Sequence, residues 1–93
     1  MHVDKAKKRI TKHVNRGFKG YPLINIEYFG ATSDVANQVA VQFTLTEGDS
    51  PQQEILASKI DAREDETIQT SLLKIIERTQ VSSVLQTEGV TIL

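Results

Sequence analysis

Cations crowd the beginning of this 93-residue chain, and they are the residues whose type and spacing could do chemistry. Residues 1–22 contain Lys5, Lys7, Lys8, Arg9, Lys12, Arg16 and Lys19, with Asp4 as their one carboxylate. The remaining 71 residues contain four cations and eleven carboxylates, so a net charge of −1 conceals a segment of +6 joined to one of −7. This division favours an anionic partner for the basic segment. Attraction between the two segments, within one chain or across a dimer, explains it at least as well.

Residues 15–22 add two aromatic rings and two glycines to this charge. Arg16 and Lys19, with free N–H groups around the glycines, could hold a phosphate. Phe18 or Tyr21 could then stack on a nucleic-acid base. The candidate residues for binding an anionic partner are therefore Lys5, Lys8, Arg9, Lys12, Arg16, Phe18, Lys19 and Tyr21.

The same stretch also fits a joint between a helix and a strand. Gly17 suits the left-handed residue that follows a helix, and Gly20 frees the backbone to reverse. Pro22 pushes Tyr21 toward extended geometry before a strand, which would let Phe18 and Tyr21 cover one edge of the core. An RNA-recognition-motif signature does not fit, because the proline interrupts the strand that it needs. A phosphate-clamping Gly-x-x-Gly loop does not fit either, because no helix follows the glycines.

Two amphipathic helices are predicted. In the first, the apolar residues at helical spacing are Val3, Ala6, Ile10 and Val14. Asp4 could cap this helix or place its charge at the positive end, and the cations fall largely on the other faces. In the second, over residues 66–79, the periodic residues are Ile68, Leu72, Ile75, Ile76 and Thr79, behind an acidic start. This second pattern is the clearest helix in the chain.

Strands are predicted over residues 23–29, 39–45, 54–60 and 81–85, with an apolar tail at 90–93 that could pair or pack. The first two strands should form an antiparallel hairpin, because the connection is too short for a parallel crossover. The third is ambiguous, since the residues before it also fit a helix start, and we choose a strand. The second helix then crosses over to a parallel last strand. The fold class is α+β: one domain over residues 1–93, with two helices on one face of a mixed, mostly antiparallel sheet of three to five strands, in the order α-β-β-β-α-β.

Short words along the chain resemble a family of small, uncharacterised bacterial proteins. They are Gly17-Phe18-Lys19-Gly20-Tyr21-Pro22, Tyr28-Phe29-Gly30, Val39-Ala40-Val41, Glu47-Gly48, Asp61-Ala62-Arg63 and Val84-Leu85-Gln86-Thr87-Glu88-Gly89. The resemblance implies a bacterial, intracellular protein and no established activity. Members of that family continue past the Thr-Glu-Gly turn into a tail with cysteine and histidine that could bind metal. This sequence ends at Leu93 without those residues, so the resemblance transfers no metal site.

An enzyme can be imagined from the strand order. Three antiparallel strands, a helix and a parallel strand resemble the first half of ribonuclease-H-like nucleases, which gather carboxylates around two metal ions. Glu27, Glu66 and Glu88 occupy corresponding elements and could hold Mg²⁺ through oxygen ligands. That fold uses further strands and helices that 93 residues cannot supply, so the likeness is an analogy of fold alone.

Other catalytic sets are not credible. His13 adjoins the apolar stripe of the first helix, which favours a structural role, and His2 is eleven residues away. The serines at positions 71, 82 and 83 lack a nucleophile elbow, and no nucleotide-binding fingerprint is present. The sequence therefore predicts no catalytic residues, no metal and no cofactor, and it favours a protein that is not an enzyme.

The expected function is binding in the cytoplasm. No apolar run approaches the roughly 20 residues needed to cross a bilayer, and the absence of cysteine fits a reducing compartment. We expect a small cytoplasmic protein whose basic N-terminal helix and loop engage an anionic partner, either nucleic acid or an acidic protein. The alternative is a homodimeric structural or interaction module, and the remote alternative is the ribonuclease-H-like nuclease.

Overall fold

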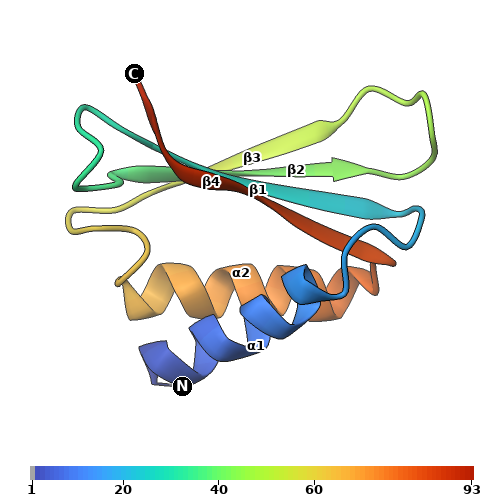
Figure 1. The fold of residues 1–93 in the computed structure, drawn as a ribbon, viewed down its shortest axis with the longest axis horizontal. Helices are drawn as coiled ribbons and strands as arrows, with labels where there is room; N and C mark the ends of the chain where they lie inside the picture. Colours follow the sequence, from blue (N-terminus) through green and yellow to red (C-terminus); the bar gives the residue numbers. More distant parts are fainter. Residues whose placement is uncertain (1) are drawn as a thin grey trace.

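Two layers make up the structure: a four-stranded sheet, and two helices that both lie against one face of it (Figure 1). The computed structural model describes residues 2–93. Its elements are α1 (Val3–Asn15), β1 (Leu23–Gly30), β2 (Gln38–Thr44), β3 (Gln52–Ala57), α2 (Glu66–Thr79) and β4 (Ser83–Ile92). The predicted α+β class and the order α-β-β-β-α-β are confirmed.

The strands lie in the order β3-β2-β1-β4. β1 pairs antiparallel with β2 and β2 antiparallel with β3, so the predicted hairpin is present. β4 pairs parallel with β1 after the crossover through α2, as predicted. β1 is therefore a central strand, and β3 and β4 are the two edges of the sheet.

Two strand predictions differ from the structure. β3 runs over Gln52–Ala57 and not over 54–60, because its hydrogen bonds to β2 set its limits and the next residues turn toward α2. The strand predicted at 81–85 and the tail at 90–93 are one strand, β4. Ile26 pairs with Gln86 but Tyr28 pairs with Val90, so three residues of β4, 87–89, lie opposite a single residue of β1. Gly89, with φ of +71°, allows the chain to rejoin the ladder after them.

The core lies between the sheet and the helices. Alternate residues of β1 point into it because side chains alternate along a strand, and the rest of β1 faces the uncovered side of the sheet. The core residues are Ala6, Ile10, Ile24, Ile26, Tyr28, Ala36, Val39, Val41, Ala62, Ile68, Leu72, Leu73, Ile76 and Val84. α1 buries only Ala6 and Ile10, whereas α2 buries five residues, so α1 is the more lightly held helix.

The ends of α1 follow local chemistry. His2, and not Asp4, is the N-cap, since its Nδ1 accepts a hydrogen bond of 3.4 Å from the Asp4 N–H. Asp4 lies in the first turn, where its charge faces the positive end of the helix dipole. Gly17 follows the helix with φ of +70°, and its N–H donates to the Val14 carbonyl, so the predicted helix end is confirmed.

Asp65 caps α2 and is expected to stabilise the protein in a pH-dependent way. Its Oδ1 accepts hydrogen bonds from the N–H groups of Thr67 at 3.0 Å and Ile68 at 3.4 Å, and Ser58 Oγ donates to its Oδ2 at 2.6 Å. The Ser58 hydrogen bond, with the two N–H groups, holds the pKa of Asp65 below its ordinary value although partial burial opposes this. Asp65→Ala should therefore lower the free energy of unfolding by about 1 kcal/mol at pH 7.

The pH dependence follows from the lowered pKa of Asp65. The stabilisation by the charged form is complete above the unfolded-state pKa of about 3.9, and it is lost as the pH falls through the folded-state pKa. Urea unfolding from pH 7 to pH 2 should show the stability of wild type converging on that of Asp65→Ala. Asp65→Asn, which keeps an acceptor without the charge, should lie between them at pH 7. A stability difference for Asp65→Ala that stays constant down to pH 2 would contradict this account.

Candidate nucleic-acid interface

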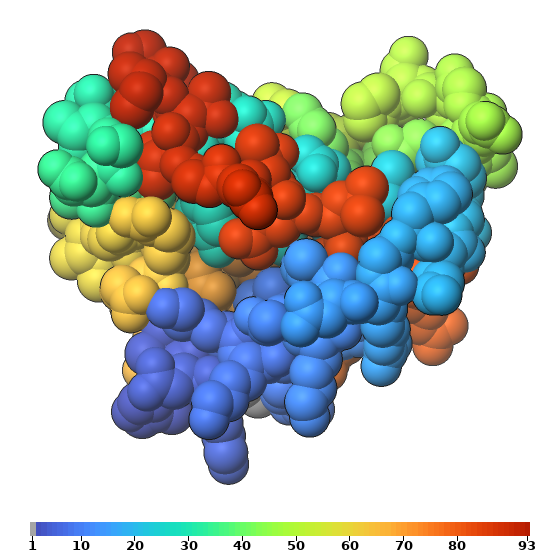
Figure 2. Space-filling model, in the orientation of Figure 1, coloured from blue at the N-terminus to red at the C-terminus, as the bar shows by residue number. Residues whose placement is uncertain are grey.

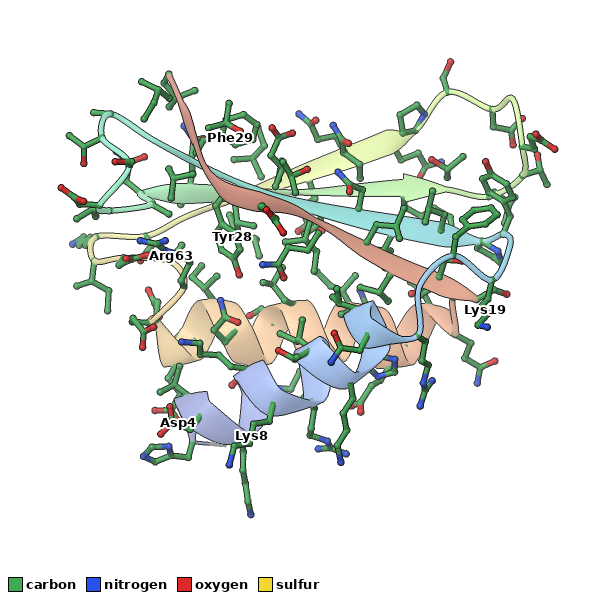
Figure 3. All side chains as sticks on the ribbon, viewed as in Figure 1. Asp4, Lys8, Lys19, Tyr28, Phe29 and Arg63 are labelled. Carbon is green, nitrogen blue, oxygen red and sulfur yellow. The ribbon has the colours of Figure 1, made fainter. Side chains whose placement is uncertain are left out.

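The face of α1 that points away from the core carries a row of cations. We call Lys5, Lys8, Arg9, Lys12 and Arg16 the basic ridge. At 100° per residue these five positions fall within an arc of about 100°, opposite the buried Ala6 and Ile10. All five side chains are exposed. α1 forms the lower surface of the molecule in Figure 2, and Figure 3 shows Lys8 extending from it into solvent.

Only part of this charge is neutralised within the molecule. Arg9 pairs with Glu77 of α2 at 3.5 Å, with both side chains about half exposed, and Lys7, beside the ridge, pairs with Glu64. Lys5, Lys8, Lys12, Arg16 and Lys19 form no ion pair with any residue between 2 and 93. Attraction between the basic and acidic segments therefore accounts for two of the seven N-terminal cations and leaves five facing solvent.

The aromatic residues of the loop after α1 stack on each other. The rings of Phe18 and Tyr21 meet edge to face, with centroids 5.6 Å apart and planes at 79°. Phe18 stays 58% exposed, so it does not cover the core edge as the helix-to-strand interpretation predicted. It is held by Tyr21 and presented to solvent at the C-terminal end of the basic ridge. A large aromatic ring in this position can contact a ligand without any rearrangement of the core.

The backbone of this loop is fixed by serines that the sequence suggested only as weak nucleophiles. Ser83 Oγ accepts from the Lys19 N–H at 2.7 Å and donates to the Gly20 carbonyl at 2.6 Å, and Ser82 Oγ donates to the Tyr21 carbonyl. With the Gly17 N–H also bonded, two N–H groups expected to hold a phosphate are already occupied. Any anion here must therefore be held mainly by side chains.

The carboxylates considered for metal binding do not come together. Glu27 accepts a hydrogen bond of 2.7 Å from Thr91 Oγ1 on the uncovered face of the sheet, whereas Glu66 begins α2 beneath the other face. Glu88 is exposed in the irregular part of β4. Within the described part of the chain, no group of three or more histidine or acidic side chains could hold a metal ion. His13 is half-buried beside the packed face of α1, as its structural interpretation predicted.

A second feature was missed by sequence reasoning: a surface pocket of about 450 Å³ between α1, the sheet and the segment before α2. We call it the Tyr28 pocket, and its lining includes Lys7, Tyr28, Arg63, Glu64, Gln69 and Gln86. Gln69 could have signalled it, because this amide occupies a core position of α2 among isoleucines and leucines. Burial is the main cause that raises the pKa of Tyr28, so its hydroxyl is protonated at neutral pH.

No protein-family model matches the chain, and no curated protein and no solved structure resembles it significantly. The resemblance to small bacterial proteins therefore stays a prediction. Neither helix found in residues 2–93 has the length and apolar character needed to cross a bilayer. What the protein does must be inferred from the basic ridge, Phe18 and the Tyr28 pocket.

Proposed function

We propose that this protein binds single-stranded nucleic acid, with the basic ridge along the phosphates and Phe18 against a base. The observation that carries the proposal is the set of four exposed ridge cations, Lys5, Lys8, Lys12 and Arg16, which have no ionic partner among residues 2–93. From Lys5 to Arg16 the ridge extends about 16 Å, at 1.5 Å per residue, which is long enough to follow several phosphates.

Several properties of this surface favour nucleic acid over an acidic protein. Protein interfaces bury an apolar centre and are depleted in lysine, whereas the ridge holds three lysines and its apolar residues face inward. Exposed Phe18, supported by Tyr21, adds a stacking platform for a base. An unpaired base is available for such stacking only in a single strand, which is why we propose this form of nucleic acid.

Salt dependence provides the test. Four or five phosphate contacts should give a slope of about −3 for log K against log salt concentration, since single strands release about 0.7 counterion per neutralised phosphate. The affinity for a labelled single-stranded oligonucleotide should then fall about 50-fold between 50 and 200 mM salt. Fluorescence anisotropy against RNA and DNA of both strandedness measures it, with the single strand expected to bind more tightly.

Two outcomes would overturn the proposal. One is the absence of binding to every oligonucleotide at 50 mM salt, and the other is an affinity that does not change with salt. Sedimentation of the protein alone is the control, because a ridge that docks on an acidic surface of a second copy would give association that weakens with salt in the absence of nucleic acid.

A further inference from the structure

The Tyr28 pocket contains an unused hydrogen-bond donor beside an unused acceptor. Gln69 Nε2 donates to the Ala62 carbonyl and to Tyr28 Oη, each at 2.9 Å. Because a carbonyl can only accept, the Ala62 contact fixes which end of the Gln69 amide carries nitrogen. The hydroxyl hydrogen of Tyr28 and Gln69 Oε1 are then left without a partner in the described chain.

Burial makes these two unused groups notable. Tyr28 is 4% exposed and Gln69 is 2% exposed, yet both side chains line the pocket. Figure 3 shows Tyr28 extending from β1 toward the helices, near Arg63 and on the opposite side of the sheet from Phe29. Buried polar groups are almost always hydrogen-bonded, so a donor and an acceptor that face a pocket indicate a ligand or water there.

The charges around the pocket select the kind of ligand. Its two cations are each paired with a carboxylate: Lys7 with Glu64, and Arg63 with Asp61 at 2.7 Å. Arg63 also donates to the Asp34 carbonyl, so its guanidinium is largely occupied. With its charges balanced in this way, the lining offers no free cation to a phosphate or carboxylate. A neutral group that presents an acceptor next to a donor fits the Tyr28 hydroxyl and Gln69 Oε1.

We propose that the Tyr28 pocket binds a nucleobase, splayed out from a strand whose phosphates lie on the basic ridge. This inference rests on the proposed function and adds a base-binding site to it. Every base has an acceptor beside a donor on its Watson–Crick edge, and proteins that bind single strands use that edge. The pocket volume lies within the range of about 300–1,000 Å³ typical of small-molecule sites.

The position of the pocket connects it to the ridge. Lys7 and Thr11 of α1 line the Tyr28 pocket, and the same two residues line a shallow surface depression together with Lys8 and Lys12. A nucleotide with its base in the pocket can therefore place its phosphate toward the ridge lysines without crossing the helix. The acidic pairs at the pocket itself repel phosphate and favour this orientation.

Free nucleosides test the pocket without the ridge. Titration of uridine, cytidine and adenosine into isotope-labelled protein should shift the NMR signals of the Gln69 side-chain amide and of the Tyr28 ring. Tyr28→Phe removes one hydroxyl and leaves Gln69 bonded to Ala62, so it should weaken nucleoside binding about 3- to 10-fold, the value of one net hydrogen bond, while the protein stays folded. Tyr21→Phe removes a hydroxyl outside the pocket and should change nothing.

The outcomes separate this inference from the proposed function. Nucleoside shifts that avoid Tyr28 and Gln69, or equal affinity in Tyr28→Phe, would overturn the base site even if oligonucleotides bind. Nucleoside binding without oligonucleotide binding would support the base site and overturn the proposed function. Glycinamide derivatives serve as the competing neutral amide, and tighter binding of these than of the nucleosides would overturn the base site in favour of a peptide.

Discussion

Reversing two lysines of the basic ridge, with Lys8→Glu and Lys12→Glu together, is expected to lower the affinity for single-stranded oligonucleotides on the order of 100-fold at 50 mM salt. Lys8 and Lys12 are one helical turn apart, exposed, and without an ionic partner among residues 2–93. The double variant removes two phosphate contacts and adds two repulsions. The magnitude of the salt slope should fall by about 2, because each lost contact releases about one counterion fewer.

A matched variant separates position from net charge. Lys59→Glu with Lys74→Glu makes the same change in net charge at two exposed residues outside α1, so it should lower the affinity only a few-fold. Anisotropy titrations of both variants at 50 mM salt measure the difference, and circular dichroism checks that both stay folded. Equal loss in the two variants would mean that the ridge is not the contact surface.

The second helix shows what sequence reasoning can predict in this protein. Its bounds, 66–79, match the structure at both ends, because an acidic N-terminal turn, an apolar stripe and a basic last turn are all local signals. The β1–β2 hairpin is equally local, since alternation and a short connection determine it. The exposure of the ridge was predicted for the same reason: the apolar stripe of α1 fixes which face is left outside.

Features that depend on pairing between distant segments were not predictable. β3 is an edge strand with almost no buried residue, so no burial pattern in its sequence could mark its ends. Arg9 was grouped with the free cations, but its pairing with Glu77 depends on how α1 packs against α2. Tyr28 and Gln69 are 41 residues apart, and nothing local brings their side chains together. The base site therefore emerges only when the two layers are assembled.

Gly30→Ala is the substitution expected to cost the most stability, about 3 kcal/mol or more of the free energy of unfolding. Gly30 is not in the left-handed region, so the cost is one of space and not of φ. A Cβ there would lie well under 3.0 Å from the Val35 carbonyl oxygen and 3.2 Å from both the Thr32 carbonyl oxygen and Val90 Cγ1. Two of these three atoms belong to the backbone, so rotation of a side chain cannot make room.

The loop that presses on Gly30 is itself held in place and supports the base site. The Ala62 N–H donates to the Ala36 carbonyl at 2.6 Å, and the Ala36 N–H donates to Asp61. These bonds position the Ala62 carbonyl, which orients the Gln69 amide in the pocket. An alanine at position 30 should push this loop away, so any Gly30→Ala protein that folds should also bind nucleosides more weakly.

Gly48→Ala is the control for Gly30→Ala. Its added Cβ meets nothing within 4 Å, and only the left-handed φ of +87° opposes it, at a cost of about 1 kcal/mol. Urea unfolding should therefore place Gly30→Ala at least 2 kcal/mol below Gly48→Ala, or show no folded baseline for it at all. Equal stability of the two variants would mean that the loop can move away from Gly30 at little cost. The close contact between β1 and that loop would then not be what positions the Ala62 carbonyl.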